Sequence, residues 1–167
     1  MKIKLALIVI LFGLLTTQAQ DKITVAVGTN STFIETYNKN SWSGNFTLNK
    51  AYRLGPTSLK TLKDGVKTSL KWIELNNSYY KTFQKEVCRF KTMEKESFKF
   101  HGYVDEFAEE MTMIFYGESD GSFKIEIKPY NSYSIFITFT NLDMLRGFKD
   151  LLDGKSANNE IDDIFKK

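Results

Sequence analysis

The sequence predicts an α+β fold, in which an antiparallel β-meander sheet is preceded by two helices and followed by one or two more, packed on one face. The first observation is a change in hydrophobic period, from about 3.6 residues over 59–90 to two residues over 98–139. The second is the shortness of the links between the period-two segments, which are turn sequences such as Gly-Glu-Ser-Asp-Gly at 117–121. Because short links join antiparallel neighbours, these segments form a meander with one face on a core.

The first nineteen residues have the three parts of a cleavable secretion signal. Lys2 and Lys4 give a positive start, Leu5–Leu15 is an apolar run, and Ala19 supplies the small residue at the expected cleavage point. The run is too short to span a bilayer, which needs about 20 apolar residues. The processing site resembles that of exported bacterial proteins. We therefore expect a mature chain that begins at Gln20 and works in the periplasm or outside the cell, with no transmembrane segment after cleavage.

The mature part, residues 20–167, has the length and composition of a single globular domain. Aromatic residues make up 14% of the chain and it contains two prolines, which is typical of a packed core and not of a disordered tail. The formal net charge of +3 gives no indication of nucleic-acid binding. Cys88 is the only cysteine, so it has no internal disulfide partner, and we expect a buried apolar thiol.

The N-terminal half is predicted to hold three strands and two helices. The strands are 23–27, 33–37 and a weaker one at 46–54. Apolar residues then recur every three or four positions between Ser58, a suitable N-cap, and Asn76. The spacing of the aromatic and apolar residues that follow predicts a second helix over about 79–92.

The C-terminal half is predicted to hold the meander and then helical structure. Its apolar residues alternate in four strands, within 98–104, 111–115, 123–128 and 133–140. A helix follows over 142–152 and ends at Gly154, and residues 161–165 form a short last helix or a docked tail.

One face of the meander carries aromatic and charged residues side by side. If Ile125 faces the core, then Glu126 faces solvent, and in simple register its face also holds Tyr116, Lys124, Lys128 and Phe136. A polar face that carries Tyr, Phe and Lys together is typical of a recognition surface. The alternative is that another element, such as the N-terminal strands or the last helix, covers this face.

The first helix carries a basic stripe, which consists of Lys60, Lys63, Lys67 and Lys71. Such a stripe is suited to an anionic polysaccharide, lipid headgroups or an acidic partner. Ordinary solvated charge beside an apolar stripe explains the same residues.

His101 is the only histidine, and it precedes an acidic cluster formed by Asp105, Glu106, Glu109 and Glu110. Two carboxylates in different environments are able to act as general acid and base. A single histidine excludes metal sites that need two, and the cluster matches no Ca²⁺ loop. A solvated turn between strands explains these residues equally well.

Together these patterns favour an exported, non-enzymatic binding or accessory protein of a bacterial envelope or secretome. We expect no catalytic residue, metal or cofactor, and a protein or polysaccharide partner outside the cytoplasm, with no nucleic acid. Two alternatives stay open: an assembly subunit that associates through a sheet edge or face, and a hydrolase that uses the acidic cluster with His101.

Overall fold

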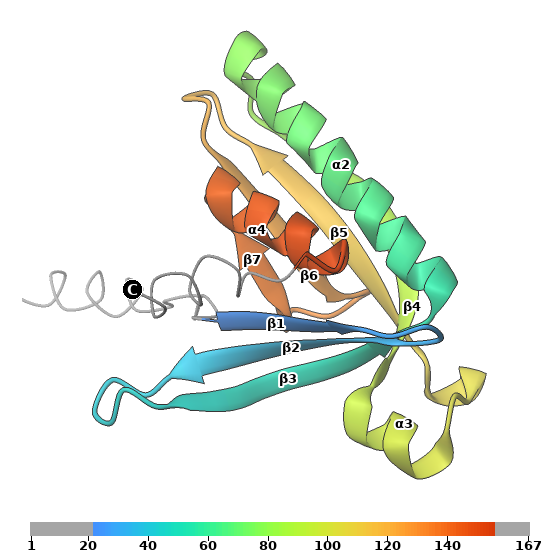
Figure 1. The fold of residues 1–167 in the computed structure, drawn as a ribbon. Coiled ribbons are helices and arrows are strands. Elements are labelled where there is room, and N and C mark those ends of the chain that lie inside the picture. The colour runs from blue at the N-terminus through green and yellow to red at the C-terminus, as the bar shows by residue number, and fades with distance from the viewer. Residues whose placement is uncertain (1–21, 156–167) are drawn as a thin grey trace, which may run out of the picture.

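The computed structural model describes residues 22–155, which form a seven-stranded antiparallel open sheet with helices, and this confirms the α+β class (Figure 1). The strands follow one another in the sheet in their order along the chain, from β1 to β7. The elements are β1 (Lys22–Val27), β2 (Thr32–Lys39), β3 (Phe46–Leu54), α2 (Pro56–Tyr79), β4 (Phe83–Glu94), α3 (Lys95–His101), η1 (Asp105–Phe107), β5 (Glu109–Gly117), β6 (Phe123–Pro129), β7 (Ile137–Phe139) and α4 (Leu142–Leu152).

The sheet has two parts, which we call the first wing (β1–β3) and the second wing (β4–β7). They are joined where β3 meets β4, by only two residue pairs, Tyr52 with Glu94 and Arg53 with Met93. From that point the wings diverge, and α2 and α4 lie on one face of the second wing (Figure 1). The short helix α3 lies below the first wing, on the side away from α2 and α4 (Figure 1).

The core lies between α2, α4 and the strands. It takes Leu62, Val66 and Ile73 from α2, whose apolar stripe is the one expected from the sequence. Leu145 and Phe148 of α4 complete the helical side. From the second wing it takes the alternating residues Met111, Met113, Phe115, Ile125, Ile127, Ile137 and Phe139, all of which are nearly inaccessible to solvent.

The prediction of a helix over 79–92 is wrong, because most of this segment forms β4. Strand β4 contains a β-bulge between Glu86 and Cys88, which adds one residue to the strand. The extra residue disturbs the alternation, so that the apolar side chains Phe83, Val87 and Phe90 are four and three positions apart. This spacing imitates a helix, although each residue is part of an extended chain.

The prediction of a strand over 98–104 is also wrong, since residues 95–101 form helix α3. The carboxylate of Glu94 caps this helix by accepting hydrogen bonds from the backbone N–H groups of Glu96 and Ser97. The Phe98 ring packs edge-on against Phe33 of β2, with ring centroids 5.8 Å apart. The last predicted strand is shorter than expected, because β7 begins at Ile137 and the residues before it form a loop.

The other predicted strands and the helices at 58–76 and 142–152 are present. The predicted secretion signal, residues 1–19, and the predicted segment 161–165 lie outside the described residues. Among residues 22–155, no helix combines the length and the apolar character that crossing a bilayer requires.

Candidate functional site

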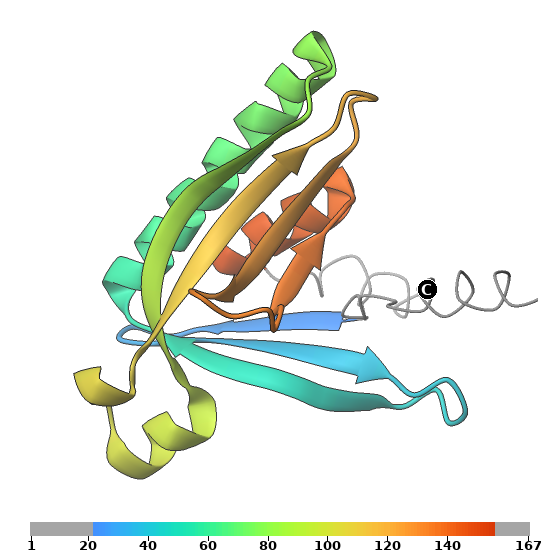
Figure 2. The same cartoon turned by 180° about the vertical axis from the view of Figure 1, so that it is seen from behind.

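The outer face of the second wing is the face opposite α2 and α4, and none of the described helices lies over it (Figure 2). The alternation of β5 and β6 determines which side chains it carries. Because Met111, Met113, Ile125 and Ile127 point into the core, their neighbours along the chain point outward. The strand register places these neighbours in rows: Tyr116 beside Lys124, Ile114 between Glu86 and Glu126, and Thr112 between Arg89 and Lys128.

Three side chains near the β5–β6 turn, Tyr116, Lys124 and Glu126, form a polar cluster in which each contacts the other two. The Lys124 amine lies 2.8 Å from one carboxylate oxygen of Glu126 and 4.5 Å from the centroid of the Tyr116 ring. The Tyr116 hydroxyl donates to the other oxygen of Glu126, at 3.1 Å. Burial, followed by the charge of Glu126, raises the pKa of Tyr116 to about 12. The structure therefore brings two of the four expected surface residues, Tyr116 and Lys124, together around the Glu126 carboxylate, which binds both.

Two side chains on this face are less exposed than the sequence predicts. Glu126, expected in solvent, is only 5% exposed because Tyr116 and Lys124 cover it. The prediction that Phe136 lies on an open surface is wrong, because this residue is 4% exposed and packs edge-on against Tyr52 of β3. The first wing therefore covers the lower end of this face, which is the alternative that the sequence leaves open.

A groove of about 370 Å³ opens beside Lys128, the remaining residue of the expected surface. We call it the tyrosine groove. It is lined by Glu86, Thr112, Ile114, Lys128, Tyr130, Asn131, Ser132 and Tyr133. Within residues 22–155 Lys128 has no ion-pair partner, so its amine is available to a ligand. The groove therefore combines hydroxyl groups, an amide, an amine and a carboxylate with two aromatic rings.

The turn that follows β6 shapes one wall of the tyrosine groove. Asn131 has a positive φ of 62°, which asparagine tolerates better than most residues, and the Ser132 N–H donates to the Pro129 carbonyl at 3.1 Å. The turn leaves Tyr133 completely exposed. Tyr130 is held from below, because the Arg89 guanidinium lies 3.8 Å from its ring centroid.

A bidentate ion pair holds Arg89 in that position. Its guanidinium donates to both carboxylate oxygens of Glu86, at 2.8 and 2.9 Å. This contact, with a smaller contribution from Thr112, lowers the pKa of Glu86. One edge of the groove therefore carries a carboxylate that is charged at neutral pH and is fixed in place.

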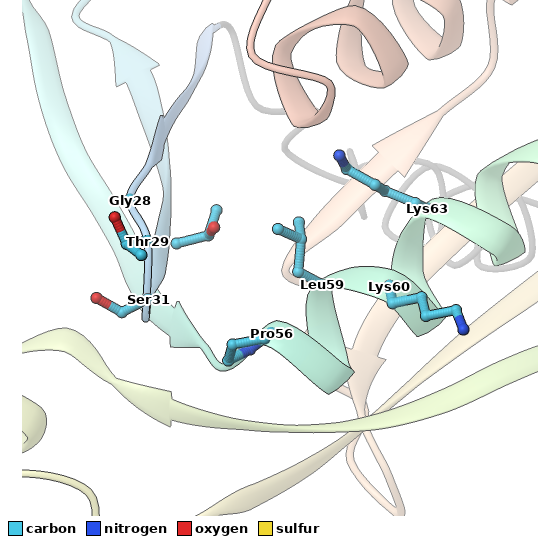
Figure 3. Close-up of a pocket in the computed structure, with 8 residues that line it drawn as sticks. Gly28, Thr29, Ser31, Pro56, Leu59, Lys60 and Lys63 are labelled. Carbon is cyan, nitrogen blue, oxygen red and sulfur yellow. The ribbon is translucent and has the colours of Figure 1, made fainter.

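The basic stripe of α2 does not form one convergent site. Lys63 lies 3.2 Å from Asp153 after α4, and Lys67 lies 3.6 Å from Asp64. Lys60 and Lys63 line a groove of about 300 Å³ between the β1–β2 turn and the start of α2. In that groove Leu59 points toward the turn, whereas the amine of Lys60 points away from it (Figure 3). Lys71 is exposed on the outer side of the helix.

The acidic cluster is divided among separate partners. Asp105 binds Lys91 at 2.9 Å and accepts from the Tyr103 hydroxyl at 3.0 Å, and both contacts lower the pKa of Asp105. Glu110 lies 3.9 Å from Arg89, and the strand register places it opposite Lys91. Glu106 is exposed, and Glu109 raises the pKa of the Tyr52 phenol, although burial is the larger cause.

His101 lies between the exposed rings of Phe100 and Phe107, with ring centroids 5.8 and 5.3 Å away. Among residues 22–155, no hydrogen bond or ion pair joins its imidazole to a carboxylate of the cluster. Among the described residues, no group of three or more His, Cys, Asp or Glu side chains is arranged to hold a metal ion.

Sequence reasoning missed Tyr130 and Tyr133, which it treated as a turn residue and a strand residue. Their signal was the pair of tyrosines around Asn-Ser directly after Pro129, since a turn needs no aromatic side chain. Comparisons of the chain with protein-family models, curated proteins and solved structures returned no match. Any function must therefore be inferred from the α+β fold and from the geometry of its surfaces.

Proposed function

We propose that this chain is a non-enzymatic binding protein that acts outside the cytoplasm and binds an oligosaccharide segment in the tyrosine groove. The observation that carries the proposal is a completely exposed tyrosine, Tyr133, beside Tyr130 at a groove whose other walls are mostly hydrogen-bonding side chains. The location rests on the secretion signal expected at residues 1–19.

The chemistry of the groove suits a sugar better than an apolar ligand. A pyranose ring presents one or two C–H faces and a rim of hydroxyl groups. An aromatic ring packs against such a face at little entropic cost, since tyrosine has only two side-chain torsions. The rim requires donors and acceptors, which Lys128, Asn131, Ser132 and Glu86 supply.

The groove also matches a segment of a longer chain better than a single small molecule. It is open along the outer face, and its volume of about 370 Å³ is at the low end for ligand sites. A polysaccharide is able to place one or two units in it while the rest of the polymer continues along the sheet.

Affinity electrophoresis in gels that contain neutral or acidic soluble polysaccharides tests this function. We expect at least one polysaccharide to retard the native chain, and Tyr133→Ala to weaken that retardation by about tenfold or more, which corresponds to roughly 1.4 kcal/mol. Tyr133→Phe should retain most of the affinity, because it keeps the ring.

Tyr79→Ala is the matched control. Tyr79 is another exposed tyrosine, at the end of α2 and away from the groove, so its removal should leave the retardation unchanged. If no polysaccharide retards the native chain, oligosaccharide binding in this groove is refuted. The same holds if Tyr133→Ala and Tyr79→Ala change the retardation equally. Self-association by light scattering in the absence of any polysaccharide would instead favour the assembly subunit.

A further inference from the structure

The β2–β3 hairpin extends past the rest of the first wing. Within residues 22–155, strand β1 pairs with Thr32–Tyr37 of β2, and residues 40–47 of the β2–β3 hairpin extend beyond that pairing. We call residues 38–48 the hairpin arm. Both views show it projecting from the molecule at the end opposite α3 (Figures 1 and 2).

The turn at the tip of the arm is closed without help from the Trp42 side chain. The Asn40 side-chain oxygen accepts from the N–H groups of Trp42 and Ser43, at 2.9 and 3.1 Å. Gly44, with φ of 69°, donates to the Asn40 carbonyl at 2.8 Å. Trp42 is 98% exposed, so its side chain stabilises neither the turn nor the core. The indole is therefore accessible to a binding partner.

Behind the tip, the arm carries exposed apolar residues, with one lysine on the arm and another beside it at the start of β1. Phe46 and Leu48 are each about half exposed. The Lys22 amine lies 5.5 Å from the centroid of the Phe46 ring, and Lys39 is the register partner of Phe46. Residues 36–50 contain no Asp or Glu. The nearest carboxylate along β2, Glu35, is neutralised by Lys95.

We propose that the hairpin arm inserts into the interface of a membrane that carries anionic lipid, with Trp42 at the leading position. A protruding tryptophan matches the headgroup region of a bilayer, where tryptophan is enriched. Apolar side chains followed by lysines match the order of the acyl boundary and the anionic headgroups. The positive charge of the arm favours an anionic surface over a neutral one. The proposal is independent of the tyrosine groove, which lies on the second wing.

The test uses Trp42 as its own reporter, because the apolar run Leu5–Leu15 is able to bind lipid by itself. The chain has two tryptophans, so the full chain with Trp72→Phe leaves Trp42 as the only one. We expect its emission to shift to shorter wavelength with vesicles of phosphatidylcholine and phosphatidylglycerol, and brominated lipid to quench it. Vesicles of phosphatidylcholine alone should give a much weaker change. If Trp72→Phe impairs folding, the difference spectrum between wild type and Trp42→Phe gives the same readout.

Two charge variants locate the contact. Lys22→Gln with Lys39→Gln should raise the lipid concentration needed for half of the shift by about tenfold, because each lysine near an anionic surface contributes to binding. The matched control is Lys60→Gln with Lys71→Gln on α2, which should leave the lipid concentration at half of the shift unchanged. An unchanged Trp42 emission with anionic vesicles overturns the proposal, as does a larger effect of the control pair. A shift that depends on protein concentration without lipid would also overturn it, and would assign the arm to a second copy of the chain.

Discussion

Gly65 lies where α2 comes closest to the second wing. A Cβ atom at this position would lie 2.6 Å from the Cys88 sulfur, which is too close, and 3.2 Å from the Met113 sulfur, which is a tight contact. Glycine in a helix costs about 1 kcal/mol relative to alanine. The close approach of helix and sheet therefore explains a residue that helix propensity alone disfavours.

We predict that Gly65→Ala lowers the free energy of unfolding by about 1–3 kcal/mol, because the cost of overpacking exceeds the gain in helix propensity. Cys88→Ala should recover part of this loss in the double variant, since it removes the 2.6 Å contact and leaves the Met113 sulfur at 3.2 Å and the residue 88 Cβ at 3.6 Å. Urea melts of the two single variants and the double variant measure the coupling.

Gly147 in α4 is the matched control, because a Cβ there would meet nothing within 4 Å. Gly147→Ala should raise the free energy of unfolding by about 0.5–1 kcal/mol, as expected from helix propensity. If Gly65→Ala stabilised the protein as Gly147→Ala does, α2 would have room to move away from the sheet. The close contact would then not require glycine at position 65.

The thiol of Cys88 gives a second prediction for a single residue. Burial, with a smaller contribution from Glu86, raises its pKa to about 11. Since the thiolate is the reactive form, native protein at pH 8 should react with a thiol reagent on the order of 100-fold more slowly than protein unfolded in urea. Equal rates would mean that the contact between α2 and β4 opens frequently.

Helix α3 is attached to the first wing by an ion pair that is sensitive to pH. Lys95 at the start of α3 binds Glu35 of β2, and Tyr37 also donates to that carboxylate. Lys95, and then Tyr37, lower the pKa of Glu35. A carboxylate with a lowered pKa in the folded state stabilises the fold above its unfolded pKa, and this contribution is lost as the pH falls through the folded value.

We therefore predict that Glu35→Gln lowers the free energy of unfolding at pH 7, and that its difference from wild type is smaller at pH 3, where more of the carboxylate is protonated. Urea melts at the two pH values measure both differences. Glu96→Gln is the control, because Glu96 binds only the exposed Lys99 on the same helix and should change little at either pH. A Glu35→Gln effect of the same size at both pH values would indicate that packing, and not charge, attaches α3.

In the second wing and its helices, the elements that the sequence predicts correctly are those whose periodicity is undisturbed. Strands β5 and β6 alternate without a bulge, and α2 and α4 have continuous apolar stripes. Strand β4 could not be predicted, because a single bulge residue changed its spacing to that of a helix. For α3, two phenylalanines two residues apart imitate a strand, although only Phe98 packs against the sheet and Phe100 is exposed.

The candidate site was predictable in part. Alternation placed Tyr116, Lys124 and Lys128 on the outer face, because that requires only the period of one strand. The burial of Phe136 depends on Tyr52, which is 84 residues earlier in the chain, so no local pattern indicates it. The tyrosine groove depends on the path of the turn after β6, which the sequence does not indicate. Tyr133 lies in the loop before β7, because that strand begins at Ile137 and not at 133 as expected.

The two wings share one buried core, although little backbone pairing joins them. Backbone pairing between them is limited to two residue pairs of β3 and β4. Away from that ladder, the Tyr52 and Phe136 rings bring the wings together, with centroids 4.8 Å apart and planes at 77°. Nearby, the Lys50 amine of β3 donates to the Ser134 hydroxyl in the loop before β7. Ile34 and Leu54 of the first wing also belong to the common core. The packing around Phe136 is therefore a direct contact between the wings, whereas Ile125 belongs to the second wing.

The different locations of Phe136 and Ile125 predict that their loss destabilises different parts of the molecule. Phe136→Ala should cost about 3–5 kcal/mol and Ile125→Ala about 2–5 kcal/mol, since both remove buried apolar side chains. Hydrogen exchange at low denaturant should separate them. Phe136→Ala should speed exchange in β1–β3 more than in β5 and β6, because the lost ring packs directly on β3. Ile125→Ala should speed exchange in both wings, because it weakens the core itself. If Phe136→Ala raised exchange equally in every strand, the wings would unfold as one cooperative unit, and the shared core would be sufficient to couple them.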